Sequence, residues 1–278
     1  MRIMKITKFL SGALVLFVAW LVCDSVLASN ISTGSECSLG EAILSAETDT
    51  AISGCSSGAG ADIIKVNQNE SIVSIPSGEY PDGQNAFKSI TTSISILGYN
   101  HTISLENNTS IPGRLFNVIA GGELHISDMN FVDLNSTAPL MENGGFLFAE
   151  NGVVKLTNVS IDGFLATSFG GGIYSANSSL DLIKTKFSNN EVTSEGFILG
   201  GGAIFLDDGS LKIQSSKFLG NVSGGQGGAI LNIAGFTDFT ISQSVFADNL
   251  AEYGSAISAG SASFDDSLSI ELSQFENN

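Results

Sequence analysis

Two adjacent pairs of acidic residues are the first candidates for chemistry in the second half of the sequence. They are Asp207-Asp208 and Asp265-Asp266. Carboxylates serve polysaccharide hydrolases as paired acids, and they serve lyases together with a calcium ion and a basic residue. Both pairs lie close to glycine or serine, where aspartate favours turns by hydrogen-bonding to the backbone. We therefore interpret them as turn residues and expect no cofactor. Calcium binding remains an alternative, although no glycine-aspartate nonapeptide repeat of the calcium-binding type supports it.

The basic residues do not complete a catalytic site. His101 and His125 are the only histidines, and neither stands beside a serine or cysteine nucleophile motif. Arg114 lies in a stretch that resembles an ordinary strand, and Lys186 and Lys217 occupy equivalent places that suit an outer face. No base for proton abstraction next to a uronate is evident. We predict no catalytic and no metal-ligating residues and lean towards a protein that is not an enzyme. The alternative is a polysaccharide lyase or glycoside hydrolase whose acids come from neighbouring coils and converge in one groove.

A partly aromatic row is the candidate binding feature. Tyr174, Phe205, Leu231 and Ser258 each follow an isoleucine that recurs along the chain. If the isoleucines point inward, these residues form a stripe on the outer surface that would bind sugars or a partner protein. Changing Tyr174 or Phe205 to alanine would then leave stability within roughly 1 kcal/mol. The opposite strand phase would make the same residues part of the core.

These candidates belong to a unit that recurs every ~30 residues, as in solenoid proteins. Each unit has a glycine run, a short apolar strand, a polar turn, a second strand with alternating apolar residues and a closing Phe-x-x-Asn. Alternation places the apolar residues on one face, and stacked asparagine amides would hydrogen-bond from coil to coil. The repeated positions are Ile173, Phe187 and Asn190; Ile204, Phe218 and Asn221; Ile230, Phe246 and Asn249; and Ile257, Phe275 and Asn278.

The N-terminal segment, residues 1–28, has the pattern of a secretory signal peptide. Basic residues precede an apolar run from Phe9 to Cys23, and a small-residue cleavage pattern ends at Ala28. We therefore predict a secreted or cell-surface protein with no membrane span after cleavage. The formal net charge of −17 at pH 7 opposes binding to nucleic acids or anionic lipid.

The next segment carries the features of a cap. Cys37 and Cys55 form an even pair in an exported chain, which predicts a disulfide. Ser38–Ser45 has capping-box spacing and an apolar stripe, which predicts a short helix that covers the first coil. We assign residues 29–89 to this cap and the first coils, and residues 90–278 to the repeats, which are incomplete at the C-terminus.

Two groups of motifs resemble known families. The segment ECSLGEAILSAE, followed by a second cysteine and GADIIKV, resembles the CSLREA segment of exported β-helix proteins, with Gly40 in place of the motif's arginine. The repeated GGAI and FxxN motifs are similar to those of polymorphic outer-membrane proteins in the pectin-lyase-like superfamily. The resemblance implies an all-β, right-handed parallel β-helix, secreted or displayed at the outer membrane, that forms part of an adhesin or autotransporter passenger.

We therefore expect a binding scaffold whose partner is a carbohydrate or a cell-surface protein. Asn278 falls at the last position of a repeat. An uncapped coil exposes apolar core and an unpaired strand edge. We expect either that the natural gene product continues beyond this residue or that the chain associates end to end.

Overall fold

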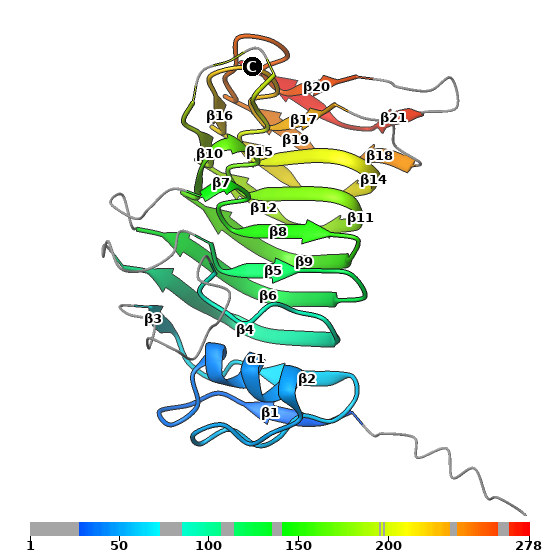
Figure 1. The fold of residues 1–278 in the computed structure, drawn as a ribbon. Coiled ribbons are helices and arrows are strands. Elements are labelled where there is room, and N and C mark those ends of the chain that lie inside the picture. The colour runs from blue at the N-terminus through cyan, green and yellow to red at the C-terminus, as the bar shows by residue number, and fades with distance from the viewer. Residues whose placement is uncertain are drawn as a thin grey trace, which may run out of the picture.

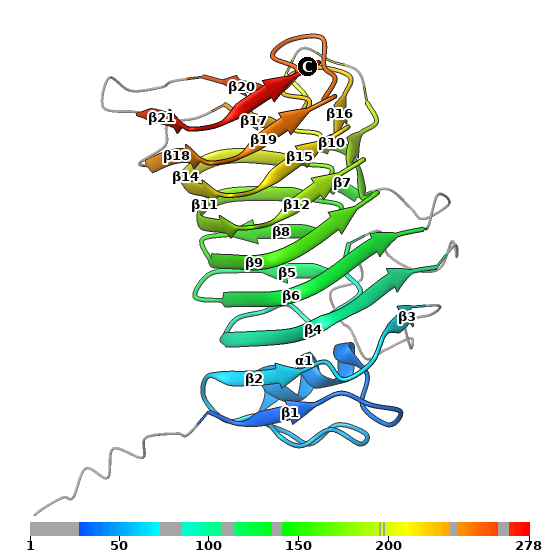
Figure 2. The ribbon, with the colours of Figure 1, turned by 180° about the vertical axis from the view of Figure 1, so that it is seen from behind.

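The chain winds into a parallel β-solenoid of about 7 turns with one short helix near its N-terminal end (Figure 1). Seen from behind, the turns stack in chain order (Figure 2). The predicted all-β solenoid with a capping helix is therefore confirmed. Of the predicted signal segment, all but Ala28 lies outside the described residues. The computed structural model describes residues 28–72, 85–106, 114–134, 141–194, 196, 198–233, 238–260 and 267–278.

The strands form an 18-stranded sheet and a four-stranded sheet of β7, β10, β13 and β16. The elements in chain order are β1 (Asn30–Ser32), α1 (Leu39–Thr48), β2 (Asp62–Lys65), β3 (Glu70–Ile72), β4 (Ser93–Leu105), β5 (Phe116–Val118), β6 (Glu123–Asp133), β7 (Met141–Asn143), β8 (Leu147–Glu150), β9 (Val153–Asp162), β10 (Leu165–Phe169), β11 (Ile173–Ile183), β12 (Lys186–Ser188), β13 (Glu191–Val192), β14 (Ile204–Gln214), β15 (Lys217–Leu219), β16 (Val222–Ser223), β17 (Ile230–Asn232), β18 (Asp238–Ser242), β19 (Val245–Ala247), β20 (Ile257–Ala259), β21 (Leu268–Glu271) and β22 (Gln274–Glu276).

A regular coil turns at corners where single residues adopt the left-handed conformation. In the coil of β11, β12 and β13, these are Asn177, Lys184 and Asn189, with φ values of 48°, 53° and 54°. A positive φ reverses the chain within one residue, and asparagine tolerates it better than most residues. Because every coil turns at matching places, β11 pairs in parallel with β14 on one side and with β8 and β9 on the other.

One glycine column allows the coils to approach closely. A Cβ added at Gly171 would lie 2.3 Å from the carbonyl oxygen of Gly202, and one at Gly202 would lie 2.2 Å from that of Gly228. The backbone cannot move away from such a contact without breaking the hydrogen bonds between the coils. The glycine run that opens each repeat is therefore required by coil spacing as well as by its turn.

The lumen is filled by matching apolar side chains from each coil. Ile173, Ile204 and Ile230 are fully buried, as their inward placement requires. The rings of Phe187 and Phe218 stack with centroids 5.1 Å apart and planes 5° apart. Phe246 and Phe275 continue this stack in the next coils. At the last described coil, Ile257 is partly buried and Phe275 is 44% exposed.

A column of four asparagines, of which Asn278 is exposed and the other three are buried, joins the last four coils at one corner. The Nδ2 of Asn190 donates to the Oδ1 of Asn221 at 2.9 Å, and Asn221 donates likewise to Asn249. The step from Asn249 to Asn278 is 2.8 Å. Each accepting oxygen also receives the backbone N–H of the donor asparagine at 3.1 Å. Each Nδ2 also donates to a carbonyl, as Asn221 does to Phe187 at 3.2 Å, so the buried amides are satisfied.

A second column, of small hydroxyl residues, runs along the neighbouring corner. The backbone N–H of Thr185 donates to the Oγ of Ser216 at 3.0 Å. Ser216 and Ser244 donate in the same way to Ser244 and Ser273, at 3.1 Å in both cases. These residues stand two places before the repeated phenylalanine and were not predicted from the sequence. The column hydrogen-bonds corner N–H groups that the strand ladder leaves unpaired.

The N-terminal cap consists of α1 and the segment that follows it. Ser38 and Glu41 form both hydrogen bonds of a capping box, and the helix extends from Leu39 to Thr48, beyond the predicted Ser45. Its apolar face belongs to the same buried cluster as the lumen. Cys37 and Cys55 form a disulfide with Cα atoms 5.0 Å apart, as predicted.

Two glutamates tie this cap to the coils. The Glu47 carboxylate accepts the backbone N–H groups of Thr91 and Thr92 at 3.0–3.1 Å, and it also accepts both hydroxyls. Glu70 accepts the backbone N–H of Leu39, the first residue of α1, at 2.9 Å. Burial raises the pKa of Glu70 against the lowering effect of this hydrogen bond, and the charge of Glu41 raises it further.

We expect Asn221→Ala to cost about 3 kcal/mol or more, because it leaves several buried hydrogen-bonding groups of the asparagine column without partners. Lys217→Ala, which truncates an exposed side chain in the same coil, should stay within about 0.5 kcal/mol of the wild type. Urea denaturation measures both free energies of unfolding. Equal values for the two variants would show that the column does not contribute to stability.

We expect Glu70→Gln to melt at or above the wild-type temperature at pH 7. The pKa of Glu70 is higher in the folded than in the unfolded chain, so its contribution to stability falls as the pH rises through the folded value. Glutamine keeps an oxygen to accept the N–H of Leu39 and removes the buried charge. Thermal melts at pH 4 and pH 7 should show the difference shrinking at the lower pH. A variant less stable than the wild type at pH 7 would contradict this account.

Candidate functional site

The predicted stripe forms a stack of rings on the outer side of the first strand of each coil. Phe148, Tyr174, Phe205 and Leu231 are in register on β8, β11, β14 and β17. The rings of Phe148 and Tyr174 lie 4.8 Å apart with planes 6° apart, and those of Tyr174 and Phe205 lie 5.1 Å apart at 15°. The stack is separate from the lumen, whose cluster contains Ile204 but not Phe205.

Most of this stripe is covered, which corrects the expectation of an exposed surface. Phe205 and Leu231 are each 1% exposed, while Tyr174 is half-buried. The ring of Phe169, at the end of β10, lies 4.4 Å from that of Phe205. Gly200 passes so close to Leu231 that an added Cβ would lie 3.0 Å from its side chain. The isoleucines point inward, as the stripe required, but Phe169 lies against Phe205 and Gly200 lies against Leu231.

The geometry of the stack limits what it can bind. Tyr174 is covered on both ring faces, by Phe148 on one side and Phe205 on the other. A sugar stacks on a ring face, and no such face is open between Phe148 and Phe205. Burial raises the pKa of Tyr174, and the carboxylates of Asp207 and Glu150 raise it further. The hydroxyl is therefore a neutral hydrogen-bonding group at pH 7.

Arg114 closes the N-terminal end of the stack. Its guanidinium lies 4.9 Å from the ring centroid of Phe148, a cation–π contact. It donates to Asn85 at 3.2 Å, to the carbonyl of Gly144 at 3.0 Å and to the carbonyl of Asn143. Burial lowers the pKa of Arg114 to about 10, so it remains a cation at neutral pH. The residue that looked like part of an ordinary strand is a buried clamp between coils.

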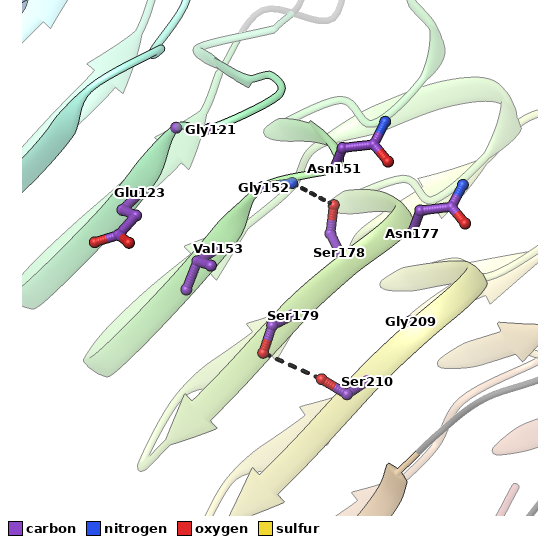
Figure 3. A pocket seen from close by; sticks show the side chains of 11 residues that line it. Gly121, Glu123, Asn151, Gly152, Val153, Asn177, Ser178, Ser179, Gly209 and Ser210 are labelled. Atoms are coloured by element: carbon purple, nitrogen blue, oxygen red, sulfur yellow. Dashed lines mark hydrogen bonds between the residues drawn. The ribbon is translucent and has the colours of Figure 1, made fainter.

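A shallow polar groove of about 370 Å³ crosses four coils beside this stack. It lies at the corner between the first and second strands, where Asn151 and Asn177 take positive φ values of 55° and 48°. The side chains of these two asparagines project in the same direction from successive coils (Figure 3). The groove is lined by Gly121, Gly122, Glu123, Asn151, Gly152, Val153, Asn177, Ser178, Ser179, Gly209 and Ser210.

Hydroxyl groups continue this groove along the second strand. The Oγ of Ser210 donates to that of Ser179 at 3.1 Å, and Ser178 accepts the backbone N–H of Gly152 at 3.1 Å (Figure 3). The groove was not predicted from the sequence. The available signal was an asparagine or aspartate four places after the start of three successive first strands, at Asn151, Asn177 and Asp208.

The acidic residues do not gather in this groove. Glu123 is its one acidic lining residue among those described. On the adjoining outer face, Asp181 pairs with Lys155 at 3.6 Å and Asp238 pairs with Lys212 at 2.8 Å. These four alternate in charge along consecutive coils, so they neutralise one another.

The remaining sequence candidates also fall outside a cluster. Asp208 adopts a φ of 64° and accepts the N–H of Gly209 at 2.6 Å, which is turn chemistry. His101 lies 3.2 Å from Asn69, whereas His125 lines a separate hollow with Lys155. Asp265-Asp266 lies outside the described residues. Within the described ranges, no group of three or more acidic, histidine or cysteine residues is placed to hold a metal ion.

Comparison with known proteins gives one informative similarity. No family model matches the chain. The chain is 41% identical over 75 residues to a protein described as "Probable autotransporter YfaL" from Escherichia coli strain K12. The match covers 25% of this chain and 6% of that protein, so the chain corresponds to a small part of its relative's length. In the part of the chain that the structure describes, no helix is long and apolar enough to cross a membrane.

We expect Phe205→Ala to cost about 3 to 5 kcal/mol, because it empties a buried site between Tyr174 and Phe169. Tyr174→Phe keeps the ring stack and removes only the hydroxyl of a half-buried side chain, so it should change stability by no more than about 0.5 kcal/mol. Chemical denaturation distinguishes the two. A Phe205→Ala protein as stable as Tyr174→Phe would mean that the stripe is as open as the sequence suggested.

Proposed function

We propose that this chain is the binding scaffold of an exported, surface-displayed protein and that it serves as a passenger-like segment without enzymatic activity. The similarity to part of a probable autotransporter supports this proposal most directly. The signal-like pattern before Ser29 supports export. The Cys37–Cys55 disulfide suits an oxidising compartment outside the cytoplasm.

The solenoid favours binding over catalysis. A stack of coils presents long faces whose corners vary without disturbing the lumen. Hydrolysis of a glycoside commonly needs two carboxylates on opposite sides of the bond, and the groove offers Glu123 alone among the described residues. The lyase or hydrolase alternative therefore finds less support than the scaffold.

The groove is the surface that we assign to the partner, in place of the ring stripe. Amides from Asn151 and Asn177 and hydroxyls from Ser179 and Ser210 are neutral groups that both donate and accept hydrogen bonds. They suit the hydroxyls of a neutral carbohydrate. The net charge of −17 disfavours a strongly acidic polymer by long-range repulsion.

Intact cells that express the full natural protein should bind an antibody raised against the purified solenoid without being permeabilised. This result is expected because an exported passenger faces the medium. Flow cytometry before and after permeabilisation provides the measurement, with a cytoplasmic protein as the negative control. If the antibody binds only after permeabilisation, surface display is wrong.

Binding of the same cells to an array of neutral glycans tests whether the groove is a carbohydrate site. Asn177→Gly keeps a residue that accepts positive φ and removes the amide, so antibody binding should persist while glycan binding weakens about tenfold. Asn189→Gly, at a corner outside the groove, is the matched control and should bind normally. Equal loss in both variants, or binding to a host protein with no glycan dependence, would reject the groove as a carbohydrate site.

A further inference from the structure

The first coil contains a buried carboxylate that lacks a full set of partners. Asp62, at the start of β2, is 1% exposed. Its Oδ1 accepts the backbone N–H of Ala59 at 2.8 Å and the hydroxyl of Ser29. Its Oδ2 is buried and has no hydrogen-bond partner among the described residues. The site is tight, since a Cβ added at Gly58 would lie 2.8 Å from Oδ2 and equally close to the backbone of Ala46 in α1.

Such a carboxylate is expected to have a cation beside it. A buried charge without a partner costs several kcal/mol, and pairing with an opposite charge offsets much of that cost. No lysine, arginine or histidine among the described residues forms an ion pair with Asp62. A positive charge from another source would therefore complete this site.

Ser29 is placed to supply that charge. It is the first residue after the cleavage pattern that ends at Ala28. Its backbone N–H donates to the carbonyl of Ala59 at 3.3 Å, and its carbonyl accepts the N–H of Ile63 at 2.9 Å. The nitrogen and hydroxyl oxygen of one serine are three bonds apart, and this hydroxyl donates to Oδ1 of Asp62, so the nitrogen of Ser29 lies within roughly 6 Å of that oxygen.

We propose that cleavage between Ala28 and Ser29 creates an ammonium group that forms an ion pair with Asp62 and completes the first coil. Hydrolysis of this peptide bond consumes one water molecule. It leaves a carboxylate on Ala28 and an amine on Ser29, which takes up a proton. The inference rests on the proposed export of the chain, because export supplies the cleavage.

The ion pair would make the stability of the cap depend on processing. Before cleavage, the nitrogen of Ser29 is an uncharged amide that has one hydrogen to donate, and it donates it to Ala59. After cleavage, the same nitrogen carries a positive charge and three hydrogens. The strands β1 and β2, which pair at the N-terminal end (Figure 1), are then held by charge as well as by their ladder.

The test compares two forms of the purified chain, prepared without relying on export. One begins at Ser29 after release from an N-terminal fusion, and the other is the same protein acetylated at its Ser29 amine. The free-amine form should melt higher by about 3 °C or more, because only this form can make the ion pair. In an Asp62→Asn background, the two forms should melt together. Equal melting temperatures with Asp62 present would overturn the proposal.

An exposed carboxylate provides the matched control. Asp181→Asn, on the outer face of β11, should leave the difference between free and acetylated forms unchanged. Should Asp62→Asn fail to fold, the reaction of the wild-type Ser29 amine with an amine reagent replaces it. Slow labelling in the folded protein, relative to the protein in urea, supports the ion pair, and labelling at equal rates overturns it.

Mass spectrometry of the exported natural protein tests the cleavage site separately. An amino terminus at Ser29 supports the proposal, and any other terminus overturns it. Failure of surface display in the antibody experiment would reject the proposed function without altering the melting comparison. The two hypotheses can therefore fail independently.

Discussion

The structure depends on one constraint, that the groups buried by a coil must be satisfied by the coils beside it. Strand N–H and carbonyl groups meet this requirement through the parallel ladder, and the corners need side chains to meet it. Asn221 and Ser216 do so by accepting N–H groups from the preceding coil. Because an asparagine can serve only an equivalent position one coil away, the constraint fixes both the residue type and the spacing of the repeat. The close approach of neighbouring coils also requires that position 202 be a glycine.

This constraint explains why much of the fold was predictable from the sequence. A residue that must match its neighbour in every coil appears as a period in the chain, and Phe218 and Asn221 were recognised in that way. The helix was predictable for a local reason, since the Ser38 and Glu41 capping box acts within one turn of α1. The end of α1 at Thr48 was not predictable, because the last turn of the helix has no comparable sequence signal. The disulfide followed from a pair of cysteines in an exported chain.

The features that were missed depend on contacts that the repeat spacing does not reveal. Phe205 and Leu231 occupy outward positions, and periodicity alone predicts that they are exposed. Phe169 at the end of β10 lies against Phe205, and Gly200 lies against Leu231, contacts that the spacing of the repeated unit does not reveal. Arg114 was missed for a similar reason, since it clamps coils through the backbone of Asn143 and Gly144. The hydroxyl column escaped notice because a serine such as Ser216 is equally common on a strand surface.

The division between repeated and variable positions also indicates where specificity must lie. A lumen residue cannot change without a matching change in the adjacent coil, so the lumen is poorly suited to recognition. The corners of the groove tolerate any residue that accepts a positive φ, and Asn151 and Asn177 carry their amides there. The first coil differs again, because among the described residues β1 pairs with a strand on one side alone. This end is held by other means, namely a helix, a disulfide and the carboxylate of Glu47, which accepts the N–H groups of Thr91 and Thr92. An unsatisfied carboxylate such as Asp62 is therefore most informative at this end, because β1 and β4, the strands paired with β2, leave its Oδ2 without a hydrogen-bond partner among the described residues.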